Sequence, residues 1–378
     1  MKIVAIAGSR IPSDTANSIQ TMKACSALVQ LGHDLTLLVP DFDPRPLTFN
    51  FQGHYGLPGI FPIEWLKSTN RRFFTWGSVR RALAHHPDLL YIWMPQSAVF
   101  GLLARKPVIF EAHLQPTGMF GPLWHRAFAH LHGRKRLACI TEALRTTLER
   151  DHRMHLRADE VVVAPNGVEL ERFASLPNPE TARQSLGLRE APTVLCAGHL
   201  YQGRGTDLFL QLAKALPDVH FVWVGGRQED VTEWRGKAGN LSNVTFTGFV
   251  PNADLPRHLA AADVLLMPYA RSILGSSGDA SSAAVASPMK MFEYMAAGRA
   301  ILTSDLPVIR EVLDDSSAAF VPPEDSTAWA SMLKHMLSDP ARRARLASNA
   351  RREVEKYTWI ARAQKIMQGF PGSASGIL

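Results

Sequence analysis

One repeated pattern organises the sequence: short apolar runs, each followed by a segment of helical periodicity. An apolar run at 2–7 ends at Gly8, a helical pattern at 16–31 stops at Gly32, and a second apolar run follows at 34–40. After a polar stretch at 171–192 the same order restarts with an apolar run at 193–198. Apolar strands without polar alternation, alternating with helices, predict parallel sheets. The chain is therefore expected to form two doubly wound α/β domains.

The composition agrees with an ordinary globular protein in two domains. The chain has 378 residues, of which 46% are hydrophobic and 20% are charged. No apolar run approaches the roughly 20 residues that a membrane-spanning helix needs. The first residues, MKIVAIAGSR, are typical of a first strand and not of a signal peptide. The three cysteines are far apart, which favours a reduced, cytoplasmic protein without a disulfide framework or a zinc site.

The positive charge is concentrated in the first part of the chain. Residues 1–170 contain 19 Lys and Arg against 13 Asp and Glu, whereas residues 171–378 contain 22 against 21. This asymmetry favours contact with an anionic membrane surface, although it is also compatible with a role in solubility alone. No nucleic-acid-binding module is recognisable, so nucleic acid is not expected as a partner.

The stretch 41–76 shows no regular periodicity and mixes aromatic with basic residues. Such a stretch can rest on a membrane interface or receive an acceptor, or it can be a long loop folded against its own domain. Asp41-Phe42-Asp43 has the spacing of a metal-binding D-x-D, but its place between a strand and two prolines disfavours that role. We expect no bound metal.

Two candidate residues follow apolar strands of the first domain. Gly8 ends the first strand, and His113 comes just after the strand at 107–110. Open α/β sheets bind ligands at the carboxyl ends of their strands. An imidazole there is able to donate a hydrogen bond to a sugar hydroxyl or a phosphate, and a purely structural histidine is the alternative.

The loop GHLYQGRG at 198–205 connects a strand to a helix in the second domain. Glycines let backbone N–H groups approach a phosphate, and Arg204 is able to grip two phosphate oxygens. The spacing differs from the dinucleotide-binding fingerprint, which disfavours a dehydrogenase.

The stretch SPMKMFEYMAAGRAILTSDLPVIREVL at 287–313 predicts a helix over 288–297, a stop at Gly298 and a strand at 300–303. The free N–H groups and positive dipole end of such a helix suit a phosphate, and Lys290 adds a full charge. Glu293, one turn later, is able to accept hydrogen bonds from a ribose diol. Plain packing of the helix is the alternative.

Together, several segments resemble the retaining glycosyltransferases of family 4, with the GT-B fold. They are GSRIPSDTANSIQTMKACSALVQLGHDLTLL, PNGVELERF, GHLYQGRGTDLFLQLA, PDVHFVWVGG, NVTFTGFVPNADLPRHLAAADVLLMPY and the stretch at 287–313. They span nearly the whole chain in the order of that family.

The resemblance implies two Rossmann-like, doubly wound parallel-sheet domains facing a central cleft. It gives an acceptor-binding domain at 1–170, a linker at 171–192, a nucleotide-sugar-binding domain at 193–357, and a helix at 358–378 that packs back on the first domain. His113, Arg204, Lys290 and Glu293 become the expected catalytic residues. The expected donor-binding residues are Gly8, Gly198, His199, Gly203, Arg204, Gly248, Phe249, Lys290 and Glu293.

Two positions depart from the family pattern. The first Glu of its E-x7-E motif falls at Val285, so the carboxylate expected near the donor hexose is absent, and Asp279, Ser281 or backbone amides of the loop 275–286 are candidate replacements. His199 stands where a basic residue often follows the first glycine of the phosphate loop.

The resemblance implies transfer of a hexose from a nucleotide-diphosphate sugar to a hydroxyl acceptor, with retained configuration and neither metal nor cofactor. The acceptor is unknown, and a lipid-linked one at the inner face of the membrane fits the basic first half. A nucleotide-sugar epimerase or hydrolase of the same fold, or a non-catalytic nucleotide-sugar-binding protein, is the alternative. The sequence does not distinguish UDP, GDP or ADP.

Overall fold

The structure, a computed structural model, describes the chain except for residues 43–47, 68–70, 202, 273–282 and 371–378. The described chain separates into two compact units. Unit 1 comprises 1–166, 285–287 and 359–378, and unit 2 comprises 167–284 and 288–358. The polar stretch 171–192, expected to be a linker, belongs to unit 2.

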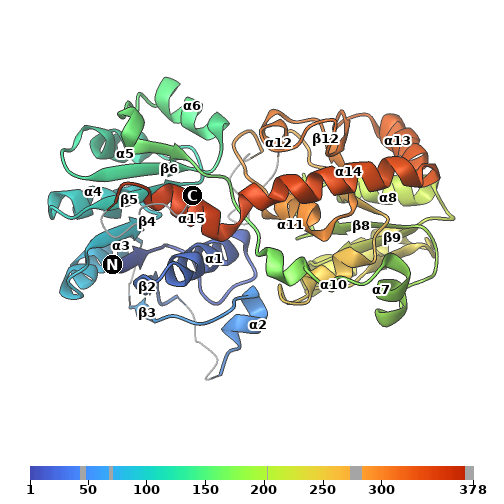
Figure 1. The fold of residues 1–378 in the computed structure, drawn as a ribbon, viewed down its shortest axis with the longest axis horizontal. Coiled ribbons are helices and arrows are strands. Elements are labelled where there is room, and N and C mark those ends of the chain that lie inside the picture. Colours follow the sequence, from blue (N-terminus) through green and yellow to red (C-terminus); the bar gives the residue numbers. More distant parts are fainter. Residues whose placement is uncertain (43–47, 68–70, 202, 273–282, 371–378) are drawn as a thin grey trace. The chain divides into compact units, whose positions relative to one another are not determined.

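Unit 1 is built on a parallel sheet of seven strands in the order β3-β2-β1-β4-β5-β6-β7 (Figure 1). The strands are β1 (Lys2–Ile6), β2 (Asp34–Pro40), β3 (Ile63–Leu66), β4 (Leu89–Ile92), β5 (Val108–Ala112), β6 (Lys135–Cys139) and β7 (Val161–Val163). The helices are α1 (Ala16–Gln30), α2 (Phe51–Tyr55), α3 (Arg71–Ala84), α4 (Pro95–Leu103), α5 (Gly121–His130), α6 (Glu142–Arg150), the 3-10 helix η1 (Ala158–Glu160) and α15 (Trp359–Met367).

Unit 2 contains a parallel sheet of six strands in the order β10-β9-β8-β11-β12-β13. The strands are β8 (Thr193–Ala197), β9 (His220–Val224), β10 (Val244–Phe246), β11 (Val264–Met267), β12 (Ala300–Ser304) and β13 (Ala319–Val321). The helices are η2 (Leu170–Phe173), α7 (Pro179–Ser185), α8 (Thr206–Ala215), α9 (Gln228–Ala238), α10 (Leu255–Ala260), α11 (Met289–Ala297), α12 (Pro307–Arg310), α13 (Ser326–Ser338), α14 (Pro340–Glu353) and η3 (Val354–Tyr357).

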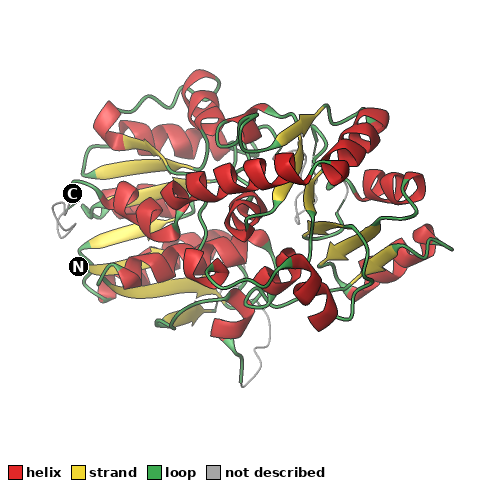
Figure 2. Cartoon of the chain, turned by 45° about the vertical axis from the view of Figure 1, so that its right-hand side comes forward, coloured by secondary structure: helices red, strands yellow, loops and turns green. Residues whose placement is uncertain are grey.

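The sheets are buried because helices pack against their strands (Figure 2). In unit 1, α1 contacts α15, while α3, α4 and α5 pack in a row. In unit 2, Phe209 of α8 meets Phe221 and Trp223 of β9 edge to face, with ring centroids 5.4 and 5.2 Å apart. Edge-to-face aromatic pairs add to the stabilisation from buried apolar area. The continuous apolar strands of the sequence are thus explained by two separate cores.

The prediction of an irregular 41–76 stretch is wrong, because the described part of it contains α2, β3 and the start of α3. Its aromatic residues mostly pack within unit 1. The Tyr55 hydroxyl accepts a hydrogen bond from the Ser13 N–H at 2.8 Å, and Trp65 donates to the Ile11 carbonyl at 2.8 Å. Among the described aromatic side chains of 49–76, Trp76 is the most exposed, at 56%. Sequence reasoning missed this order because short elements carry little periodicity.

In each sheet the strand order reverses direction between two central strands. The reversal lies between β1 and β4 in unit 1 and between β8 and β11 in unit 2. Ligands of open α/β sheets bind outside the carboxyl ends of strands at such a point. A ligand site is therefore expected at the loops that follow β1, β4, β8 and β11.

Candidate active site

The loop after β8 has a backbone that only glycine adopts easily. Gly198, Gly203 and Gly205 have φ of 133°, 82° and 86°. At Gly205 a Cβ atom would lie 2.1 Å from the carbonyl oxygen of Pro268, so any side chain would push the loop away from the end of β11. The Ala270 N–H donates to the Gly203 carbonyl at 3.0 Å. The loop is thus fastened to the segment that follows β11.

Two cations converge on one buried tyrosine at this place. Arg204 donates from Nη1 to the Tyr269 hydroxyl at 2.9 Å, and the Lys290 ammonium lies 4.3 Å from the centroid of the same ring. Tyr269 is 3% exposed. Because a phenol is neutral, it holds the two cations without cancelling their charge. The arrangement suits a ligand with more than one negative charge.

Helix α11 adds its N-terminus to these cations. Pro288 is its N-cap residue, there is no side-chain cap, and the first turn holds no acidic residue. A lysine in the first turn is electrostatically unfavourable beside the positive end of the helix dipole, unless an anion binds there. The Tyr294 hydroxyl accepts a hydrogen bond from the Ala197 N–H at 2.7 Å and fixes α11 against the end of β8.

The carboxylate of Glu293 lies one turn further along α11. Glu293 is 7% exposed and accepts a hydrogen bond from Asn252 Nδ2 at 3.3 Å. Within the described part of the chain, the buried Oδ1 of Asn252 has no hydrogen-bond partner. A buried amide oxygen beside an ordered carboxylate provides two acceptors for hydroxyl groups.

The remaining predicted donor-binding residues of unit 2 follow β8 and β10, which β9 separates in the sheet. Gly248 has a φ of 76°, and its carbonyl accepts from the Gly225 N–H at 3.0 Å. Phe249 is 49% exposed. The rings of His199 and Tyr201 stack with centroids 4.9 Å apart. Every predicted residue of unit 2 is therefore on or beside the carboxyl edge of its sheet.

In unit 1, Gly8 follows β1 and lies close to the segment after β4. A Cβ atom on Gly8 would be 3.2 Å from Met94 Sδ. The next residue, Ser9, is buried, and its hydroxyl lies 3.0 Å from that of Thr21 and also contacts Asn17.

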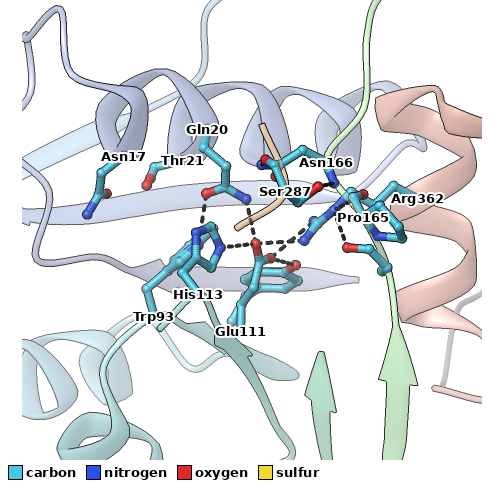
Figure 3. A network of polar contacts seen from close by, with 12 residues as sticks. Asn17, Gln20, Thr21, Trp93, Glu111, His113, Pro165, Asn166, Ser287 and Arg362 are labelled. Carbon is cyan, nitrogen blue, oxygen red and sulfur yellow. Dashed lines mark hydrogen bonds and ion pairs between the residues drawn. The ribbon is translucent and has the colours of Figure 1, made fainter. Parts of the chain in front are cut away.

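His113 belongs to a buried polar network that has Glu111 at its centre (Figure 3). Nε2 of His113 lies 2.6 Å from Glu111 Oε1. Arg362 of α15 donates to both carboxylate oxygens, at 2.7 Å from Nη2 and 3.2 Å from Nη1. Gln20 of α1 and the hydroxyl of Tyr91 on β4 also donate to Glu111. The side chains of Glu111 and Arg362 are 0% and 3% exposed.

The electrostatics of this network favour the charged pair. Burial opposes ionisation of Glu111, but the Arg362 charge and the hydrogen bond from His113 hold the pKa of that carboxyl well below its usual range. Burial likewise opposes the charge on Arg362, and Glu111 raises the pKa of Arg362. Burial and the Glu111 charge raise the pKa of Tyr91, so its hydroxyl stays protonated.

The position expected for the first Glu of E-x7-E has another role. Val285 is 2% exposed in the hydrophobic core of unit 1, and its carbonyl accepts a hydrogen bond from the Thr141 hydroxyl at 2.9 Å. The candidate replacements Asp279 and Ser281 lie outside the described residues, as does Asp43 of the D-x-D sequence. Among the residues that are described, no three His, Cys, Asp or Glu side chains group as a metal site would require.

Sequence reasoning missed Tyr269, Asn252, Gln20, Tyr91 and Arg362. Of these five residues, only Arg362 has a sequence pattern that indicates a buried charged partner. It stands three residues after Trp359 and four before Ile366, on the apolar stripe of α15, where a charged residue requires a buried partner.

Two family models match the chain. Residues 19–172 match "Glycosyltransferase Family 4", and residues 191–339 match "Glycosyl transferases group 1". No helix in the described ranges has the length and apolar character to cross a membrane.

Three known proteins illustrate the similarity. The phosphatidyl-myo-inositol mannosyltransferase of Mycolicibacterium smegmatis is 27% identical, over 94% of this chain and 90% of the relative. The protein of the same name from Mycobacterium leprae is 30% identical, over 74% of this chain and 72% of the relative. The structure of Anabaena Alr3699/HepE in complex with UDP and glucose superposes with a TM-score of 0.72 at 19% identity, over 97% of this chain and 98% of that one.

Proposed function

Because the chain belongs to the family 4 glycosyltransferases of glycosyl transferases group 1, with their GT-B fold, we propose that it moves a hexose from a nucleotide-diphosphate sugar to a hydroxyl acceptor. We further propose that the reaction retains the anomeric configuration and needs no metal ion or other cofactor. The observation that carries the proposal is the pair of cations on Tyr269 beside the N-terminus of α11, whose N-cap residue Pro288 makes no side-chain cap hydrogen bond.

Arg204, Lys290 and the first N–H groups of α11 stabilise the leaving diphosphate. As the bond from the anomeric carbon to the diphosphate oxygen breaks, negative charge grows on that oxygen. Preorganised donors at such a position lower the barrier because they do not have to reorient during the reaction. The acceptor hydroxyl forms the new bond on the same face, and its proton passes to a phosphate oxygen. No side-chain nucleophile is required.

Glu293 binds the ribose of the donor. Its orientation by Asn252 leaves the remaining lone pairs of the carboxylate for the two ribose hydroxyls. His113 and Gly8 of unit 1 belong to the same reaction, the first through a hydrogen bond to a substrate hydroxyl and the second through close approach of the backbone.

The acceptor that fits best is a lipid-linked polyol. Relatives include phosphatidyl-myo-inositol mannosyltransferases and a D-inositol 3-phosphate glycosyltransferase from Xylanimonas cellulosilytica. The compounds in these two names both contain an inositol that carries a phosphate group. We propose an acceptor of this type, used in glycolipid or glycoconjugate synthesis at the inner, cytoplasmic face of the membrane.

An exposed apolar surface of unit 1 supports membrane contact. It consists of Leu114, Met119, Phe120 and Leu123, which are 53%, 84%, 58% and 55% exposed. From Ala112 to Thr141 the sequence contains no Asp or Glu, while Arg126 and the exposed Arg134 are present. An apolar surface within a purely basic segment suits an anionic bilayer. We propose this surface in place of the aromatic stretch 49–76.

Vesicle sedimentation tests the membrane proposal. Vesicles of phosphatidylglycerol at low salt should bind the wild-type chain, and Phe120→Ser with Leu123→Ser should weaken binding about tenfold or more, because two large apolar side chains are removed. Trp76→Ser, in the other candidate stretch, should bind as the wild type does. Equal binding by the wild type and the double variant would refute the surface.

Thermal shift and product analysis test the enzymatic proposal. A screen of nucleotide diphosphates and nucleotide sugars should identify one donor that raises the melting temperature, because a ligand of the folded state stabilises it. That donor and a phosphoinositol-containing lipid should then yield a glycosylated lipid. Conversion of the donor without an acceptor would favour an epimerase or hydrolase, and binding without turnover across many acceptors would favour a binding protein.

A further inference from the structure

Within the described residues, the carboxylate oxygens of Glu111 accept hydrogen bonds from four side chains. Oε1 faces His113 Nε2, Arg362 Nη2 and Gln20 Nε2, and Oε2 faces Arg362 Nη1 and the Tyr91 hydroxyl. Gln20 is held in turn by Trp93, which donates to its Oε1 at 3.1 Å. An ionised carboxylate accepts and never donates. Glu111 is therefore oriented from four sides, and its Oε1 has a fixed place beside His113.

This arrangement decides which nitrogen of His113 carries the proton. A contact of 2.6 Å with a carboxylate oxygen requires a proton on Nε2. In the neutral imidazole, Nδ1 is then an acceptor. Within the described residues Nδ1 makes no hydrogen bond, and the His113 side chain is 26% exposed. A hydroxyl group of a substrate is the natural donor to it.

We propose that Glu111 is a positioning residue for His113, and that Arg362 of the last helix holds the Glu111 carboxylate for this task. Glu111 keeps the proton on Nε2, so His113 presents Nδ1 to a hydroxyl of the donor sugar or of the acceptor. The role of Nδ1 toward a substrate rests on the proposed function. The position of the proton on Nε2 does not depend on the proposed function.

A purely structural role is the competing explanation. Arg362 also donates from Nε to the carbonyls of Ala164 and Pro165, at 3.2 and 3.0 Å, and so fastens α15 to unit 1. The chain offers a matched control at the other end of the same helix. Arg136 donates from Nη1 to the Ile366 carbonyl at 2.7 Å and to that of Gln368, and contacts neither Glu111 nor His113. Arg136→Met therefore loosens α15 without touching the network.

The variants separate the two roles. Glu111→Leu with Arg362→Met replaces the buried ion pair by apolar side chains, an exchange that proteins commonly tolerate. Glu111→Gln with Arg362→Met also removes both charges but restores an oxygen that accepts from Nε2. A structural role predicts the same behaviour from both double variants, whereas a positioning role predicts that the glutamine restores function.

Nitrogen NMR of the full-length chain with ¹⁵N-labelled histidine gives a readout that needs no substrate. His113→Gln identifies the resonances. The wild type and Glu111→Gln/Arg362→Met should show a protonated Nε2, Glu111→Leu/Arg362→Met should show a mixture of both tautomers, and Arg136→Met should match the wild type. A wild type protonated at Nδ1, or a leucine variant that keeps the wild-type tautomer, overturns the proposal.

Kinetics with the donor found by thermal shift complete the test. Glu111→Leu/Arg362→Met should lower kcat about 10- to 100-fold, as loss of the partner that orients a functional histidine commonly does. KM for the donor should change little, and the glutamine double variant should recover most of kcat. Wild-type kcat in the leucine variant overturns the proposal. If the wild type itself transfers no sugar, the proposed function fails, and the NMR result still decides the tautomer.

Discussion

The carboxyl edges of the two sheets differ in how their charged side chains are paired. In unit 1, Glu111 and Arg362 neutralise each other, and each carboxylate oxygen has donors from the protein. In unit 2, Arg204 and Lys290 meet at the phenol of Tyr269, and within the described residues neither of them forms an ion pair with a carboxylate. A fully satisfied network rigidifies a fold, whereas cations that no carboxylate of the described residues neutralises leave their electrostatic energy for a ligand. Under the proposed function, we therefore expect unit 1 to orient a substrate group and unit 2 to bind the charged part of the donor.

The largest expected effect comes from breaking the pair in unit 1. Arg362→Met leaves a buried carboxylate without its partner and should lower the free energy of unfolding by about 3–5 kcal/mol. Urea denaturation of the full chain measures this. Arg310→Met, which removes a more exposed ion pair with Asp305 and Asp315 in unit 2, should cost less than about 1 kcal/mol. Similar losses of unfolding free energy in the two variants would contradict a larger contribution from the buried Glu111–Arg362 pair.

Removing a cation from unit 2 should act on turnover and not on the fold. Arg204→Ala should lower kcat by about 100-fold or more at saturating donor, because a preorganised charge contact to the leaving group is lost. Its melting temperature without donor should stay close to that of the wild type. A near-normal kcat would show that Arg204 does not stabilise the leaving diphosphate, and would contradict the difference proposed between the two sheet edges.

Acid should weaken unit 1 through Glu111. The folded-state pKa of Glu111 is depressed, so its stabilisation is complete above the unfolded-state pKa of about 4.3 and is lost as the pH falls toward the folded-state pKa. Between about pH 5 and pH 3 the wild type should lose about 2 kcal/mol relative to Glu111→Leu/Arg362→Met. Parallel stability curves for the two proteins would show that the carboxyl is not ionised in the folded state.

The smallest effect is expected at Tyr269. Tyr269→Phe keeps the ring face for Lys290 but removes the hydroxyl that receives Arg204, so KM for the donor should rise about threefold to tenfold. Tyr269→Leu removes both contacts and should raise KM further. Identical KM values for the two variants would mean that the ring face does not hold Lys290.

Much of the fold followed from the sequence because apolar runs and glycine stops are local signals. The helix expected at 288–297 is α11, and the strand expected at 2–7 is β1. The site was harder, because its chemistry depends on side chains far apart in the sequence. Glu111 and Arg362 are separated by 251 residues. Arg204 and Lys290 were predicted, but Tyr269 between them was not, since nothing local distinguishes that tyrosine from one in a core.

Unit 1 is assembled from segments that lie far apart in the sequence, and this affects how it folds during synthesis. Residues 1–166 reach the ribosome exit early, yet the helix that carries Arg362 emerges only after all of unit 2. Until then Glu111, on β5, lacks the counter-charge of Arg362. The nascent first unit should consequently remain loosely closed, while unit 2 is interrupted only by residues 285–287 and is able to fold before α15 emerges. Emergence of α15 then completes both unit 1 and the network that positions His113.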